Sequence, residues 1–174
     1  MNTGELLASI NLAITQNPQV ILCPWGPFGI GPAEQAAIHA ALNHHIKFVL
    51  PAGNDPQGRQ PLLGSSLASQ VAIAAAANRS AEPAPFSTAG SAVLWTIGVD
   101  VPTKQANGEV KLRSGTSFAS AIAAGMIVRV MGERPDLEPA QVIELLRSTA
   151  KSRGGTSVAL LNLDAALAKL KAGG

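Results

Sequence analysis

Apolar residues recur along the chain in two rhythms, and each rhythm predicts a different kind of element. Near the start, Leu6, Ile10 and Ile14 lie four residues apart, which is typical of a helix with one buried face. Asn2 precedes Glu5 by three positions, the spacing of a capping box. We therefore expect a helix that begins almost at residue 1 and ends near residue 16.

Short, mostly apolar runs predict buried strands at residues 20–23, 46–50, 71–76 and 93–97. Between the first two runs, Gly31-Pro32 opens an alanine-rich helix that reaches Leu42. The order strand, helix, strand is typical of a right-handed parallel crossover. Because strands this apolar need cover on both faces, we predict an α/β fold of three layers: a mostly parallel sheet with helices on both faces.

The second half of the chain adds a hairpin and three helices. Asn107-Gly108 is a strong turn signal and predicts antiparallel arms at 100–105 and 109–113. A helix from Ser117 to residue 131 is small and apolar nearly all round, which predicts that it is buried. Two further helices are predicted at 139–150 and 164–170.

Composition limits the classes of function. With 174 residues, 47% hydrophobic and 14% charged, the chain is long enough for one core, so we expect a single domain over 1–174. The net charge of +2 is small and its lysines and arginines are scattered, which argues against nucleic acid and membrane surfaces as partners. The chain has no signal-like start and no apolar run of the roughly 18 residues that span a bilayer. We expect it to be cytoplasmic as written, and secreted or of unknown location if it is an excerpt of a longer chain.

Two motifs carry candidate chemistry. The run GTSFAS at 115–120 places Ser117 in the first turn of a helix, where its N–H is free and the helix end is electropositive. Such a serine can be a nucleophile and part of an oxyanion hole. The run FVLPAGN at 48–54 ends a predicted strand with Asn54, and PFSTAG at 85–90 lies between the two motifs.

These motifs, with the segments at 134–150 and 161–166, resemble the C-terminal half of the catalytic domain of the subtilisin-like serine peptidases, the subtilase family. The resemblance implies that Ser117 is the nucleophile and that the Asn54 amide donates to the oxyanion. It also implies that the following residues bind substrate: Pro24, Trp25, Gly26, Ala52, Gly53, Gly115 and Thr116.

The family's catalytic aspartate and histidine lie N-terminal to every matched segment, together with the first strands of the sheet, and neither catalytic segment is found here. His39, His44 and His45 occupy a helix and the turn after it, where the family has no catalytic residue. Without a base the serine keeps its proton, so the isolated chain is expected to be nearly inert. No acidic cluster suggests a metal site, and no cofactor is expected.

Three functions remain open at this point. The first is a serine endopeptidase that acts on peptides or proteins and receives Asp and His from missing or partner sequence. The second is an inactive subtilase-like binding or scaffold domain. The third, a doubly wound small-molecule binder, is disfavoured because residues 26–31 lack a G-x-G-x-x-G phosphate turn. Because the missing strands would leave the strand at 20–23 as an open edge, we expect self-association or a complementary chain.

Overall fold

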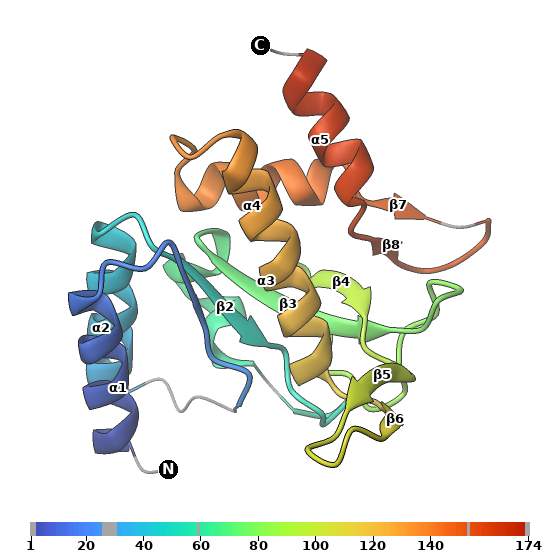
Figure 1. Cartoon of the computed structure of the whole chain (residues 1–174), viewed down its shortest axis with the longest axis horizontal. Helices are drawn as coiled ribbons and strands as arrows, with labels where there is room; N and C mark the ends of the chain where they lie inside the picture. The colour runs from blue at the N-terminus through green and yellow to red at the C-terminus, as the bar shows by residue number, and fades with distance from the viewer. Residues whose placement is uncertain (1–2, 26–30, 59, 153, 173–174) are drawn as a thin grey trace.

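The computed structural model describes residues 3–25, 31–58, 60–152 and 154–172 (Figure 1). Its main sheet has six strands in the order β1-β2-β3-β4-β8-β7. Four parallel pairings join β1 to β2, β2 to β3, β3 to β4 and β4 to β8, and only β7 is antiparallel to its neighbour. The strands are β1 (Val20–Leu22), β2 (Lys47–Pro51), β3 (Val71–Ala77), β4 (Leu94–Ile97), β7 (Lys151–Ser152) and β8 (Ala159–Leu160).

Helices cover both faces of this sheet, as predicted. The helices are α1 (Thr3–Thr15), α2 (Pro32–Asn43), α3 (Thr116–Glu133), α4 (Pro139–Ser148) and α5 (Leu163–Ala172). Side chains of β2 show the division: Phe48 and Leu50 pack with α1 and α2, whereas Val49 packs with α3 and α4. Figure 1 shows α1 beside α2 on one side of the molecule and α3 crossing the sheet in front. The sheet is therefore the middle of three layers.

The predicted strands appear within one or two residues of their expected bounds. Strands β2 and β3 are buried throughout and β4 is buried at alternate positions, which is why these strands contain few polar residues. Two of the described strands were not predicted, β7 and β8, because two residues each are too short for a periodic pattern. The capping-box residue Asn2 lies outside the described residues.

The hairpin forms where Asn107-Gly108 predicted it. Strands β5 (Val101–Lys104) and β6 (Val110–Arg113) pair antiparallel as a separate two-stranded sheet. Gly108 has φ of 85°, a left-handed conformation that glycine adopts without a steric penalty. The hairpin leads the chain back to the start of α3.

The prediction that α3 is buried all round is wrong for one of its faces. Its inner face is buried against β2, β3 and β4, but the following positions are exposed: Ala121, Gly125, Val128 and Gly132. The Val128 side chain is 53% exposed. Each of these four residues lies about one turn from the next, so all four are on one side of the helix. A helix that is apolar nearly all round therefore leaves one side exposed. We call these four exposed residues the open face of α3.

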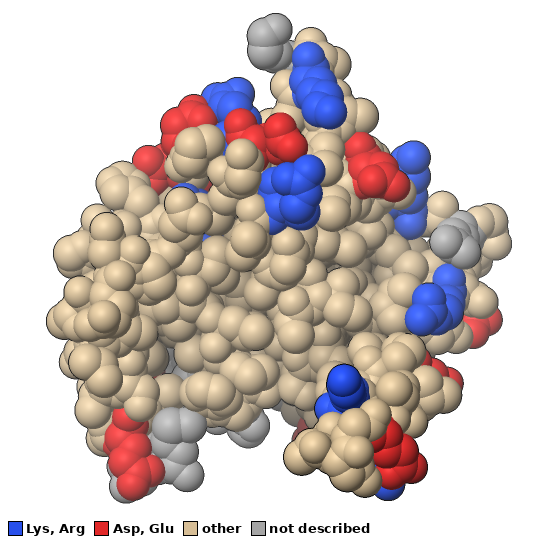
Figure 2. Space-filling view, viewed as in Figure 1, with Lys and Arg blue, Asp and Glu red and all other residues tan. Residues whose placement is uncertain are grey.

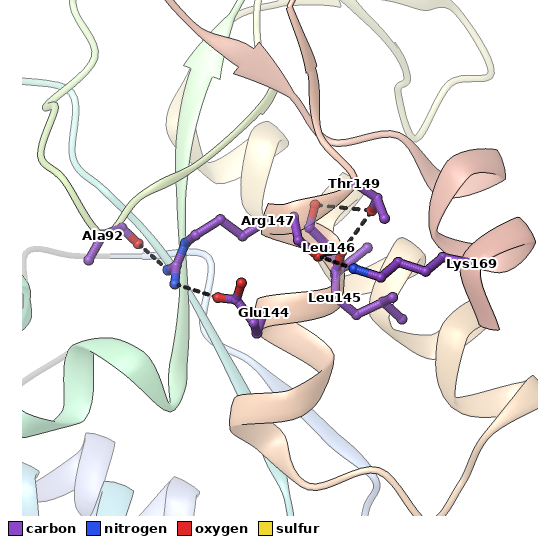
Figure 3. A network of polar contacts seen from close by, with 8 residues as sticks. Ala92, Glu144, Leu145, Leu146, Arg147, Thr149 and Lys169 are labelled. Atoms are coloured by element: carbon purple, nitrogen blue, oxygen red, sulfur yellow. Dashed lines mark hydrogen bonds and ion pairs between the residues drawn. The ribbon is translucent and has the colours of Figure 1, made fainter. Parts of the chain in front are cut away.

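Polar contacts tie α4 to both of its neighbours (Figure 3). The Arg147 guanidinium donates to the carbonyl oxygen of Ala92 at 3.2 Å and lies 3.5 Å from the Glu144 carboxylate. From α5, Lys169 Nζ donates to Ser148 Oγ at 3.0 Å. These contacts hold α4 against the loop before β4 and against α5. Among the described residues, no helix has the length and apolar character needed to cross a membrane.

Candidate active site at the start of helix α3

The chain leaves β2 through a turn whose geometry requires glycine. Ala52 N–H still donates to the carbonyl oxygen of Ala74 on β3 at 2.8 Å. Gly53 then adopts φ of 114°, a conformation that residues with a side chain rarely adopt, and a Cβ there would lie 2.9 Å from Thr88 Oγ1. Thr88 closes the turn from the other side, since its N–H donates to Gly53 O at 2.9 Å and its hydroxyl donates to Asp55 O at 2.6 Å. The turn therefore presents Asn54 in a fixed orientation.

Thr116 fixes the Asn54 side chain with two hydrogen bonds. Its backbone N–H donates to Asn54 Oδ1 at 2.8 Å, and its hydroxyl donates to the same oxygen at 2.9 Å. The hydroxyl also accepts from Gly53 N–H at 3.2 Å. Because the amide oxygen is occupied on this side, the amide nitrogen is directed to the other side, where no described residue accepts a hydrogen bond from it.

The Asn54 amide nitrogen and the Ser117 hydroxyl approach the same point above Gly115. A Cβ built on Gly115 would lie 3.5 Å from Asn54 Nδ2 and 3.3 Å from Ser117 Oγ. A side chain at position 115 would therefore stand between the two groups. The Asn54 and Ser117 side chains, from two separate motifs, thus lie beside the same point.

The backbone N–H and the hydroxyl of Ser117 have no hydrogen-bond partner among the described residues. In the part of the chain that the structure describes, Ser117 N–H has no acceptor, because it belongs to the first turn of α3. Its Oγ likewise has no described partner, whereas its carbonyl oxygen accepts from Ser120 Oγ at 2.8 Å. The open N–H points out of the electropositive end of the helix, where negative charge is favoured.

A cavity of about 420 Å³ adjoins Ser117. Seven of the predicted site residues line it: Pro24, Trp25, Ala52, Gly53, Asn54, Thr116 and Ser117. Gly115 lies beside it at the start of α3, and Gly26 lies outside the described residues. Four lining residues were missed: Pro51, which belongs to the FVLPAGN run, and Asp55, Gly58 and Thr88. For Thr88 a signal existed, since it belongs to the PFSTAG run already singled out, but nothing in the sequence marks Gly58.

The histidines considered above lie away from this cavity, and none of its described lining residues is a histidine. His45 precedes β2 and Asn54 follows it, so the two residues lie at opposite ends of a strand about 16 Å long. The Nδ1 atom of His45 lies 2.8 Å from Glu138 Oε2 at the start of α4. Burial lowers the pKa of nearby Lys47, while the Glu138 carboxylate acts in the opposite direction. Among the described residues, no group of three or more His, Cys, Asp or Glu could hold a metal ion.

Comparisons with known proteins identify the family of this chain. The model of the subtilase family matches residues 1–163. A probable subtilase-type serine protease of Deinococcus radiodurans is 31% identical over 170 residues, which cover 87% of this chain and 23% of that protein. Subtilisin E of Bacillus subtilis is 30% identical over 169 residues, covering 92% of this chain and 44% of that protein. The chain thus spans less than half the length of these relatives.

Solved structures show the same fold. The prenylagaramide maturation protease PagA superimposes with a TM-score of 0.82 at 20% identity, over 98% of this chain and 68% of that one. A cold adapted subtilisin-like serine proteinase superimposes with a TM-score of 0.76 at 27% identity, over 92% and 60% of the two chains. The family match over nearly the whole length and the shared fold place this chain in the subtilase family, as part of a subtilisin-like serine protease domain.

Proposed function

We propose that this chain supplies the nucleophile and the oxyanion donors of a serine endopeptidase that cleaves peptides or proteins. One observation carries the proposal: Asn54 Nδ2 and Ser117 Oγ lie within 3.5 Å of a single point above Gly115. A binding domain has no need to hold an amide nitrogen and a free serine hydroxyl in this arrangement. The catalytic aspartate and histidine come from sequence outside the matched segments.

In the proposed reaction, Ser117 Oγ attacks the carbonyl carbon of the scissile peptide bond and gives its proton to the histidine. The negative charge that forms on the carbonyl oxygen is stabilised by Asn54 Nδ2–H and by the open N–H of Ser117. The carbon–nitrogen bond then breaks, and the histidine returns the proton to the leaving amine. Water, deprotonated by the same histidine, releases the acyl group from Ser117 and restores the free enzyme.

The open surfaces of the fold support a complementary segment or chain. In the part of the chain that the structure describes, β1 has a partner strand on one side only, where it pairs with β2. The open face of α3 is apolar, although surface helices of soluble proteins normally carry polar residues there. Both surfaces would be covered by further strands and a helix, and a second copy of this chain is an alternative occupant.

A fluorophosphonate probe, which phosphonylates activated serines with loss of fluoride, tests the proposal. The chain alone should react slowly, and the chain co-expressed with the upstream segment that carries Asp and His should react about 10²–10⁴ times faster, the usual contribution of a general base. Ser117→Ala should abolish labelling in both preparations. Ser91→Ala, which alters an exposed serine, is the matched control and should label normally.

Two outcomes would contradict the proposal. If the complemented protein folds and still shows no labelling that depends on Ser117, the chain is an inactive binding or scaffold domain. If the chain alone labels rapidly and Ser117→Ala abolishes the signal, it contains its own base, and His44→Ala and His45→Ala would identify it.

A further inference from the structure

A second cavity, of about 340 Å³, lies on the other half of the sheet. It lies between the end of β4, the start of β5, strand β8 and the side of α3. Much of its wall is apolar, including Ile97, Pro102, Ile122 and Met126. Its volume lies at the lower end of the range of about 300–1,000 Å³ that is typical of small-ligand sites.

Two cationic side chains also line this cavity. Arg79 follows β3 and Lys151 begins β7, so the fold brings together residues that are far apart in the sequence. Neither side chain has an ion pair or a hydrogen bond with a described residue, and no described lining residue is acidic. Elsewhere, by contrast, acidic neighbours pair with four of the chain's cations, Lys111, Arg129, Arg134 and Arg147.

Two neutral polar groups complete the lining. The Thr96 side chain is only 2% exposed, and no described residue is a hydrogen-bond partner of its hydroxyl. Asn162 uses its Oδ1 atom to accept from Ala165 N–H at 2.8 Å, which leaves its amide nitrogen available to a ligand. The lining therefore includes two neutral side chains that can form hydrogen bonds with a ligand.

We propose that this cavity binds a carboxylate attached to a short apolar group. The carboxylate pairs with Arg79 and Lys151, and the apolar group packs against Ile122 and Met126 of α3. A phosphate would satisfy the cations but would bring its remaining charge against an apolar wall, which is unfavourable. This site is independent of the chemistry proposed for Ser117. Its ligand is either a free fatty acid or the C-terminal carboxylate of a peptide with an apolar last residue.

Titration calorimetry with octanoate on the full chain is the first test, with octanamide and inorganic phosphate as comparison probes. Octanoate should bind at least about tenfold more tightly than either, because only octanoate has both the charge and the apolar tail. The double variant Arg79→Gln/Lys151→Gln should weaken octanoate binding at least about tenfold. Lys171→Gln, at the exposed end of α5, is the control and should bind as the parent chain does. Ser117→Ala should also leave binding unchanged.

The peptides acetyl-Ala-Ala-Leu with a free carboxylate and with an amidated end distinguish the two sources. Tighter binding of the acidic peptide than of octanoate identifies a peptide C-terminus, and the reverse identifies a free fatty acid. Equal binding of octanoate and octanamide, or of octanoate and phosphate, would overturn the proposal. So would unchanged octanoate binding by the double variant, provided that its melting curve shows it to be folded.

Discussion

The two edges of the sheet are built differently. On the β1 side, Cys23 N–H donates to Val49 O at 3.0 Å, and Lys47 N–H donates to Gln19 O at 3.0 Å. Residues 19 and 23 therefore face β2, and by alternation Val20 and Leu22 direct their backbone groups to the open side. On the other side the sheet ends in β7, an antiparallel strand of two exposed residues.

Short strands and lysines are the usual protection of a free edge, and β7 has both, since it begins with Lys151. Strand β1 is one residue longer, parallel and apolar, with no charged residue. Figure 2 shows the same contrast on the surface: charged side chains gather over α4, α5 and the region of β7, while the side formed by α1 and α2 is mostly uncharged. The β7 edge is suited to face water, and the β1 edge is suited to be covered.

The two cavities follow this division. The cavity at Ser117 adjoins the β1 half and includes Trp25, which is 45% exposed, whereas the cavity at Arg79 is formed within the β7 half. We infer that the first half depends on a further segment and that the second is complete. The predictions below test this difference.

The largest expected effect concerns Cys23, which follows β1 and is the only cysteine of the chain. Burial raises the pKa of its thiol from 9.0 to about 12. At pH 8 its thiolate fraction should therefore be about 10³ times lower than in the unfolded chain, and iodoacetamide should alkylate it correspondingly more slowly. Because the neutral thiol is favoured by folding, this stabilisation is present below pH 9 and is lost as the pH rises toward 12.

The matched control is Ser152→Cys on β7, in a Cys23→Ala background. Position 152 is exposed, so its thiol should react at nearly the rate of a free peptide. Mass spectrometry of the alkylated chain measures both rates. Equal rates at positions 23 and 152 would mean that the β1 half opens freely, which contradicts a packed core on that side.

The next effect concerns the Asn54 amide. Asn54→Ala in the complemented protein should slow peptide hydrolysis by about 10²–10³, the range measured when one such donor is removed from a subtilisin. Asn162→Ala removes an asparagine from the β7 half and should leave hydrolysis nearly unchanged. Steady-state kinetics should show the loss in kcat with little change in KM. A loss in KM alone would mean that Asn54 binds substrate without stabilising the transition state.

The sequence predicted features that depend on residues close together in the chain, and it did not predict those that depend on residues far apart. Asn54 and Ser117 could be named because each lies in a short motif at the end of a strand or the start of a helix. The cavity at Arg79 could not be predicted, since Arg79 and Lys151 are distant in sequence and neither belongs to a periodic pattern. The exposed side of α3 was missed for a related reason: composition shows that a helix is apolar, but not which of its faces lacks a neighbour.

A smaller effect is expected for a substitution at the β1 edge that weakens its association with another strand. Leu22→Pro removes an N–H that faces the open side and leaves the bonds of Gln19 and Cys23 with β2 in place. We expect it to weaken self-association, or binding of the complementary segment, about tenfold or more. Ser152→Pro on the β7 edge should have no effect on association. Sedimentation at micromolar concentration measures this, and a parent chain that is a stable 17.7 kDa monomer without affinity for the upstream segment would refute the proposed role of β1.

The smallest effect is expected for Thr116, which orients Asn54 without contacting the reacting atoms. Thr116→Val removes the hydroxyl that donates to Asn54 Oδ1 at 2.9 Å, but it keeps the backbone N–H that donates to the same oxygen at 2.8 Å. Losing one of the two bonds to Asn54 Oδ1, at about 1 kcal/mol, should lower kcat about fivefold. The substitution also removes the acceptor of the Gly53 N–H at 3.2 Å. Thr116→Ser retains the hydroxyl and should restore most of the activity, which a purely structural role of the threonine methyl group would not allow. If Thr116→Val lowers kcat as much as Asn54→Ala does, the backbone N–H alone cannot orient the amide; if it has no effect, the hydroxyl is dispensable for that orientation.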